Sequence, residues 1–167
     1  MIPVLQNDST ESLFRVDDSG VSAGLGFDVA APFLRLHTVS RDDCDGMGHV
    51  NNVRYLAWLE RLAWLHSDHL GLPFAEYQRL GTGCVARRHE LDYLAPALPG
   101  ETLALATWIA ENDGRASMTR AYQIVRVEDR RCVLRARTLW ACVDLLSGRP
   151  RRQPPEFLAA YQPWPRT

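Results

Sequence analysis

The chain has 167 residues, of which 46% are apolar and 23% are charged, with a formal net charge of −1 and a pI near 6.5. A chain of this length and composition forms one globular domain with a sizeable core. The balanced charge excludes general binding to nucleic acid or to anionic membranes, because both require a large basic excess. We therefore expect small molecules as partners, with no nucleic acid and no membrane among them.

Targeting and membrane signals are missing from the sequence. Residues 1 to 14 have neither the basic start nor the apolar core of a signal peptide. The most apolar window, residues 53 to 65, is interrupted by Arg54, Glu60 and Arg61 and falls short of the ~20 apolar residues of a membrane span. The four cysteines form no Cys-x-x-Cys pair. We therefore expect a cytoplasmic protein with free thiols.

Residues 1 to 30 are polar, contain several glycines and show little periodicity. We expect them to form an N-terminal arm ahead of a single domain over residues 31 to 167. The arm is too short and too acidic to act as a DNA-binding module. Within the domain, residues 33 to 39 resemble a short strand that leads into a glycine-rich loop.

A long helix is predicted after this loop. Asn51 or Asn52 supplies the polar side chain that typically caps a helix start. The helix is expected to run to about Leu70, since Gly71 fits the residue just past its end and Pro73 the stop beyond it. Apolar residues cover well over half of the helix circumference, which is typical of a helix buried on most sides.

The second half of the chain shows the alternation of strands. We expect a short helix over residues 74 to 80, strands over residues 85 to 93, 102 to 110, 115 to 127 and 132 to 144, a hairpin turn at Asn112-Asp113-Gly114, and a terminal helix over residues 155 to 161. This order indicates an α+β protein in which an antiparallel curved sheet of five or six strands wraps around one long central helix. Such a sheet has open edges, so pairing of copies predicts a homodimer or a dimer of dimers.

The run Asp43-Cys44-Asp45-Gly46-Met47-Gly48-His49-Val50-Asn51-Asn52 stands directly ahead of the long helix. A helix start offers unpaired backbone N–H groups and the positive end of a dipole, which stabilise a carbonyl oxygen or a carboxylate. Reactive side chains at such a place indicate acyl chemistry. Taken alone, however, Asp45 is more typical of a tight turn, and His49 fits a structural brace equally well.

This run, with Tyr55 and Glu60 downstream, resembles the motif of the hotdog-fold acyl-CoA thioesterases of the 4-hydroxybenzoyl-CoA thioesterase type. The similarity extends over roughly residues 33 to 150 and includes the segments from Glu90 to Pro96 and from Pro99 to Leu103. It implies a hotdog fold. It also implies hydrolysis of an acyl- or aroyl-CoA thioester to a free acid and CoA, without a cofactor.

The resemblance also implies roles for individual residues. Asp45 matches the catalytic carboxylate, which attacks the thioester carbonyl or activates a water molecule. The backbone N–H of Asn52 matches the group that polarises the carbonyl oxygen. His49 is expected to orient the substrate, and Asn51 and Tyr55 to lie against it.

Coenzyme A carries a 3′-phosphate and a pyrophosphate, so its binding requires arginine or lysine side chains. Arg87, Arg88 and Arg149 are the candidates among many arginines that are otherwise expected to be solvated on the outward faces of strands. The substrate is therefore expected to be held by its phosphates at one end and by the helix start at the other.

No metal site is predicted. Cys44 with His49 and Cys84 with His89 share a Cys-x4-His spacing, which does not match the short-spaced ligand pairs of zinc sites. Glu60, on a helix expected to be mostly buried, is interpreted as one half of a structural ion pair with a nearby cation.

Three other functions stay open on the sequence. Plant acyl-carrier-protein thioesterases carry a similar Asp-x-Asn-x-His-Val-Asn-Asn stretch, but Met47 stands at the asparagine position, which favours the coenzyme A branch. A hotdog dehydratase needs a histidine and an acidic residue at a different spacing. A non-catalytic acyl-CoA-binding module needs an effector domain, for which the arm is too short.

Overall fold

The computed structural model describes residues 14–17, 20 and 23–164. Most of residues 1 to 14, for which the sequence predicts no signal peptide, lies outside the described residues. The elements are, in chain order, β1 (Phe33–Thr38), the short 3-10 helix η1 (Arg41–Asp43), α1 (Asn52–His69), α2 (Phe74–Leu80), β2 (Thr82–Tyr93), β3 (Thr102–Asn112), β4 (Ser117–Arg126), β5 (Cys132–Asp144) and α3 (Pro155–Ala160).

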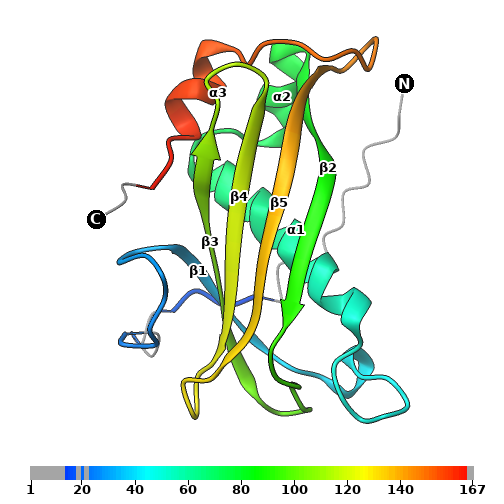
Figure 1. Cartoon of the computed structure of the whole chain (residues 1–167), viewed down its shortest axis with the longest axis vertical. Helices are drawn as coiled ribbons and strands as arrows, with labels where there is room; N and C mark the ends of the chain where they lie inside the picture. Colours follow the sequence, from blue (N-terminus) through cyan, green and yellow to red (C-terminus); the bar gives the residue numbers. More distant parts are fainter. Residues whose placement is uncertain (1–13, 18–19, 21–22, 165–167) are drawn as a thin grey trace.

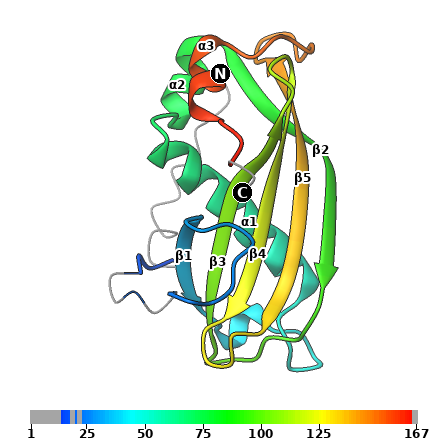
Figure 2. The ribbon, with the colours of Figure 1, turned by 60° about the vertical axis from the view of Figure 1, so that its left-hand side comes forward.

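The strands form one five-stranded antiparallel sheet in the order β1-β3-β4-β5-β2. The sheet curves around α1, which crosses its concave side, and α2 and α3 gather at one end of the molecule (Figure 1). Figure 2 shows the same curvature from the side, with α1 on one face of the sheet. This arrangement confirms the predicted α+β hotdog fold, with five strands.

The ends of α1 follow the signals in the sequence. The side chain of Asn51 accepts a hydrogen bond from the backbone N–H of Val53 at 2.9 Å, so Asn51 is the cap. At the other end, Gly71 adopts a positive φ of 81°, which only glycine tolerates readily, and Pro73 is the residue that precedes α2. The cap therefore fixes the backbone of the helix start that was predicted to bind the substrate.

One face of α1 is buried and the other is not. Trp58, Leu59 and Leu62 pack into the main core beneath the sheet. Val53 is 65% exposed, and Glu60 is exposed on the opposite face. The prediction of an ion-paired, buried Glu60 is wrong, because this carboxylate faces outward and makes no ion pair within the described part of the chain.

Two strand boundaries differ from the prediction for local reasons. Strand β2 starts at Thr82, three residues early, because Gly81 ends α2 in the left-handed conformation and Thr82 pairs at once with Asp144. Strand β4 starts at Ser117, two residues late. The carboxylate of Asp113 accepts hydrogen bonds from the backbone N–H groups of the next residues up to Ser117, which keeps them in the turn.

Part of the predicted arm belongs to the packed structure. The backbones of Arg15 and Leu36 exchange two hydrogen bonds of 2.8 Å, which adds a short bridge beside β1. Leu25 is buried in a small cluster on the convex face of the sheet, and Phe27 packs against the same cluster. The residues from Leu25 to Val29 therefore cover the outer side of the sheet, opposite α1, whereas Phe14 packs into the main core with α1.

Strand β2 is an open edge. Among the described residues it pairs only with β5, so its other side presents backbone groups without a partner in that part of the chain. Residues 85 to 90, in the middle of the strand, are all exposed, and they include the apolar Val85. An edge of this kind pairs readily with another strand.

Candidate active site at the start of helix α1

The motif segment forms a small hairpin between η1 and α1. Its two arms meet in an isolated antiparallel bridge between Cys44 and Val50. The backbone N–H of Asp45 donates to the carbonyl of His49 at 2.9 Å, and Gly48 closes the turn with a φ of 78°. The hairpin therefore holds Asp45 and His49 beside each other, a few residues from the helix start.

The carboxylate of Asp45 is exposed and only half engaged. Its Oδ1 accepts a hydrogen bond from the backbone N–H of Met47 at 2.8 Å, as in an Asx turn. Its Oδ2 makes no hydrogen bond or ion pair with the rest of the described chain. One oxygen is thus fixed by the turn, and the other is free to act as a base or a nucleophile.

Asp43, two residues earlier, has the opposite environment. It is 1% exposed, and its Oδ2 accepts hydrogen bonds from the backbone N–H and hydroxyl of Ser40 at 2.9 and 2.8 Å and lies 3.3 Å from His37. Its Oδ1 accepts two more from Arg54, at 3.0 and 3.2 Å. The backbone carbonyl of Asp43 also accepts from the N–H of Asn51 at 2.8 Å. Asp43 therefore joins β1, η1 and the start of α1.

The contacts of Asp43 also determine its charge. Burial acts to raise the pKa of this carboxyl, but the hydrogen bonds from Ser40, the nearby His37 and the guanidinium of Arg54 outweigh it and hold the pKa below its usual value. Asp43 is therefore ionised at neutral pH, yet all its accessible lone pairs are occupied. The sequence marked two carboxylates in this run, and the structure separates one with both oxygens engaged from one with a free oxygen.

The helix start offers one unused donor. The N–H of Val53 is taken by the Asn51 side chain, whereas the N–H of Asn52 has no acceptor among the described residues. The carbonyl of Asn52 accepts a hydrogen bond from the hydroxyl of Tyr93 at 3.1 Å, and the N–H of Val50 donates to Ala97 at 3.0 Å. Tyr93 and the loop after β2 thus hold the start of this 18-residue helix in place, while the N–H of Asn52 stays without an acceptor in the described chain.

Tyr55 lies beneath the helix start instead of on its surface. It is 3% exposed, and burial raises the pKa of its hydroxyl to about 12. Its ring lies edge-on to Tyr93, with centroids 5.6 Å apart. The structure therefore places Tyr55 as a support for Tyr93, although the sequence suggested a direct contact with the substrate.

The predicted phosphate-binding arginines lie on two other parts of the chain. Arg87 occupies a bulge in the middle of β2, and Arg88 forms an exposed ion pair with Glu90. Arg149 belongs to the loop that follows β5, at the end of the molecule opposite the motif hairpin (Figure 1). One chain alone therefore does not bring Arg149 and Asp45 together.

The cysteines show no sign of reactivity. Burial raises the pKa of Cys84 to about 12 and also raises that of Cys44, so both thiols are protonated at neutral pH. His89 is bonded to the hydroxyl of Thr138 at 3.0 Å instead of facing a thiol. Over the described ranges, no group of three or more His, Cys, Asp or Glu side chains is arranged to hold a metal ion.

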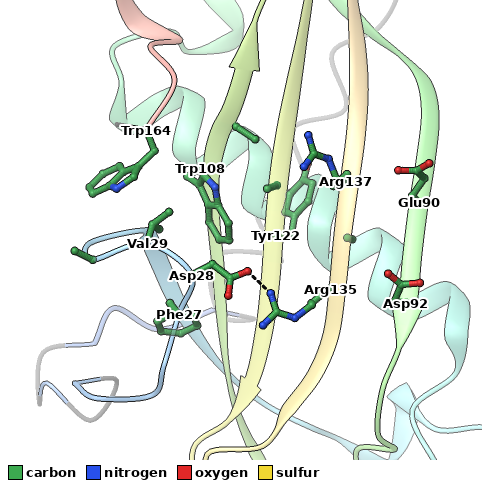
Figure 3. Close-up of a pocket in the computed structure, with 14 residues that line it drawn as sticks. Phe27, Asp28, Val29, Glu90, Asp92, Trp108, Tyr122, Arg135, Arg137 and Trp164 are labelled. Carbon is green, nitrogen blue, oxygen red and sulfur yellow. Dashed lines mark hydrogen bonds and ion pairs between the residues drawn. The ribbon is translucent and has the colours of Figure 1, made fainter. Parts of the chain in front are cut away.

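A hollow of about 780 Å³ lies on the convex face of the sheet and not at the helix start. Figure 3 shows Trp108 on its floor and the pair formed by Asp28 and Arg135 at its side. Arg137, also at its edge, is paired with Glu111 at 2.9 Å. None of the predicted catalytic residues lines this hollow, and its arginines are already paired, so we do not assign the reaction to it.

Sequence reasoning missed one polar cluster completely. Arg120 was grouped with the solvated strand arginines, but it is 1% exposed and points toward α1, where it contacts His66 and Ser67. The signal was present in the alternation of β4, since Tyr122 and Ile124 occupy the same inward face. An arginine in that register is easily mistaken for an outward one.

A curved antiparallel sheet around one long helix defines a protein of the hotdog fold. The sequence model of the thioesterase-like superfamily matches residues 39–161, and the chain belongs to this superfamily. The class of enzyme is thus a thioester hydrolase, as the motif predicted. No curated protein matches the sequence.

Solved structures share this fold at low sequence identity. The 1,4-dihydroxy-2-naphthoyl-CoA thioesterase Slr0204 from Synechocystis matches with a TM-score of 0.70 and 20% identity, over 78% of this chain and 96% of that one. The hypothetical protein SAV2348 from Staphylococcus aureus, determined in complex with CoA, matches with a TM-score of 0.73 and 15% identity, over 81% of this chain and 84% of that one. The gentisyl-coenzyme A thioesterase BH1999 matches with a TM-score of 0.65 and 17% identity, over 77% of this chain and 98% of that one. At these identities the likeness establishes the fold.

None of the helices in the described residues is both long and apolar enough to cross a membrane.

Proposed function

We propose that the protein hydrolyses acyl-CoA thioesters, with Asp45 as the reactive carboxylate and the backbone N–H of Asn52 as the donor to the thioester carbonyl. One observation carries this proposal. Asp45 has a carboxylate oxygen without a partner in the described chain, and the nearby helix start has a backbone N–H without an acceptor there. A reaction of this class requires both a base or nucleophile and a donor for the developing negative charge.

The geometry supports a simple reaction sequence. The carbonyl oxygen of the thioester accepts a hydrogen bond from the Asn52 N–H, which draws electron density from the carbonyl carbon. The free oxygen of Asp45 then attacks that carbon, or removes a proton from a water molecule that attacks it. In either case the carbon–sulfur bond breaks, and the thiolate leaves and takes up a proton. Water completes the release of the acid when an acyl-aspartate forms.

His49 is proposed to orient the substrate. It is half-buried, and its carbonyl oxygen is held by the Asp45 N–H. Its side chain makes no hydrogen bond with the other described residues, so it is available to a ligand beside Asp45. Asn51 contributes indirectly, because its cap fixes the direction of the neighbouring N–H.

The acyl-CoA class is supported by the neighbours, two of which are named CoA thioesterases and one of which was determined with CoA. In a dimer built by antiparallel pairing of two β2 edges, the loop after β5 of one copy comes close to the motif hairpin of the other. Arg149 of one copy and Arg87 or Arg88 near the centre are then placed to hold the CoA phosphates. We propose this dimer as the complete enzyme.

A panel of thioesters tests the proposal. Purified protein is mixed with short, long and aromatic acyl-CoA esters, and thiol release is followed with a chromogenic disulfide reagent. At least one ester is expected to be hydrolysed, and Asp45→Asn is expected to lose about a hundredfold or more in kcat. Asp42→Asn is the matched control, because Asp42 is exposed in the neighbouring turn. Equal activity of Asp45→Asn and Asp42→Asn would remove Asp45 from the mechanism.

A further inference from the structure

The most unusual group outside the hairpin is the guanidinium of Arg120, which is buried without a carboxylate. Its Nη1 lies 2.5 Å from Nδ1 of His66, and its Nη2 lies 3.4 Å from the hydroxyl of Ser67. Its Nε is buried and has no hydrogen-bond acceptor among the residues described. Arginine keeps its charge at all ordinary pH values, so a full positive charge stands inside the protein.

Among the residues that the structure describes, no neighbour of Arg120 neutralises this charge. Burial, together with the charges of Arg120 and His69, lowers the pKa of His66 to about 3, so His66 is neutral and accepts the hydrogen bond. Arg120 also lies over the ring of Tyr161, 5.7 Å from its centroid, and burial raises the pKa of Tyr161 and of Tyr77, so both hydroxyls stay protonated. A buried charge without a counter-ion is costly, which indicates that an anion completes the site.

A cavity adjoins this charge. It is about 30 Å³ in volume and lies between α1, α2 and the sheet, with Trp64, Cys84, Met118 and Trp140 in its walls and Arg120 and Ser67 among its polar lining. The indole N–H of Trp140 is buried near the hydroxyl of Tyr122, but it makes no hydrogen bond of normal geometry in the described chain. The space fits one small planar group, and its walls are otherwise apolar.

We propose that this cavity binds a carboxylate, with the guanidinium of Arg120 as its counter-ion and the indole N–H of Trp140 as a second donor. A carboxylate is planar and matches two parallel N–H groups of arginine. A phosphate is tetrahedral and larger, and it suits neither the small volume nor the apolar walls. The carboxylate is carried either by a free acid or by the far end of the acyl group in a thioester.

The second possible source of the carboxylate is the far end of the acyl group in a thioester. This source rests on the proposed function and on pairing of two β2 edges. The exposed run of β2 covers residues 85 to 90, so a two-fold axis at its centre places Cys84 of one copy beside Leu91 of the other. Leu91 is two residues from Tyr93, whose hydroxyl holds the start of α1. An acyl group bound at one helix start therefore extends toward the Arg120 cavity of the other copy, and a terminal carboxylate suits it.

Direct binding tests the cavity without any assumption about catalysis. The purified full chain is titrated with hexanoate and with the neutral hexanamide, and tryptophan fluorescence and the melting temperature are recorded, because Trp64 and Trp140 line the cavity. Hexanoate is expected to bind and to raise the melting temperature, and hexanamide is not. Arg120→Gln is expected to weaken hexanoate binding at least tenfold, and Trp140→Phe to weaken it severalfold if Arg120→Gln does not fold.

Hydrolysis distinguishes the two sources of the carboxylate. Glutaryl-CoA and pentanoyl-CoA have acyl chains of equal length, and only the first ends in a carboxylate. If the cavity binds the end of the acyl group, kcat/KM is expected to be higher for glutaryl-CoA than for pentanoyl-CoA by tenfold or more. This preference is expected to be lost in Arg120→Gln. It is expected to be kept in Arg135→Gln, which serves as a control on the convex face.

Each outcome decides one question. Binding of hexanoate without a preference for glutaryl-CoA supports a site for free acids. Binding without hydrolysis of any thioester supports the cavity and rejects the proposed function. Equal behaviour of hexanoate and hexanamide in the wild-type protein overturns the carboxylate site, whatever the thioester assays show.

Discussion

The two aspartates of the motif are expected to respond in opposite ways to the same substitution. Asp43→Asn replaces a buried carboxylate that accepts hydrogen bonds from Ser40 and Arg54, whereas Asp45→Asn changes an exposed side chain with one bond to the backbone of Met47. An amide has only one acceptor oxygen, so Asp43→Asn keeps the Ser40 contacts or the Arg54 contacts but not both. The structure therefore predicts a stability defect at the first position alone.

The size of the defect follows from the contacts that are lost. Hydrogen bonds to charged groups contribute about 1.5 to 3 kcal/mol each, and Asp43 loses two of them when its amide turns toward Ser40. Arg54 is itself half exposed, so water replaces part of this loss. We expect Asp43→Asn to lower the free energy of unfolding by about 2 to 4 kcal/mol, and Asp45→Asn by no more than about 0.5 kcal/mol.

Urea denaturation of both variants measures the difference directly. The expected result is a lower midpoint for Asp43→Asn with an unchanged slope, and a midpoint for Asp45→Asn equal to that of the wild-type protein. Because Asp43 has a lowered pKa, its contribution is present above the usual aspartate pKa and is lost as the pH falls through the lowered value. Equal midpoints for the two variants at neutral pH would refute the structural role of Asp43.

Two further predictions concern pH and the helix cap. Because the pKa of His66 falls from 6.5 to about 3 on folding, the unfolded chain binds a proton that the folded one does not, and stability is lost as the pH falls from about 6.5 toward 3. The free energy of unfolding is expected to fall by about 2 kcal/mol between pH 7 and pH 5 because of His66. This fall is expected to vanish in His66→Gln. The same pH dependence in that variant as in the wild-type protein would contradict the lowered pKa of His66. Asn51→Ala is expected to cost about 1 kcal/mol in chemical denaturation, because the Val53 N–H loses its acceptor. Asn51→Asp keeps the cap but places a negative charge beside the Asn52 N–H, so its stability is preserved while thioester hydrolysis falls; full activity would argue against that N–H as the carbonyl donor.

The fold was predictable because its signals are local. The cap at Asn51, the stop at Gly71 and the two-residue alternation of the strands each act over a few residues, and the structure confirms the elements that they indicated. The resemblance of the run that contains Asp45 added the class of enzyme, which the match to the superfamily confirms.

The features that sequence reasoning missed depend on contacts between distant segments. The burial of Arg120 results from the register of β4 against α1, and the packing of Leu25 on the convex face results from a return of the chain that no local pattern marks. The difference between the environments of Asp43 and Asp45 also depends on contacts with other segments. The contacts of Ser40, His37 and Arg54 make the first carboxylate structural, and all three residues lie outside the hairpin.

We propose that Asp45 performs the chemistry while Asp43 maintains the hairpin that presents it. The most direct test is the kcat for thiol release from the best acyl-CoA substrate, measured for Asp45→Asn beside Asp42→Asn at a temperature where both are folded. We expect a loss of about a hundredfold or more for Asp45→Asn and wild-type turnover for Asp42→Asn. Wild-type turnover in folded Asp45→Asn would contradict it.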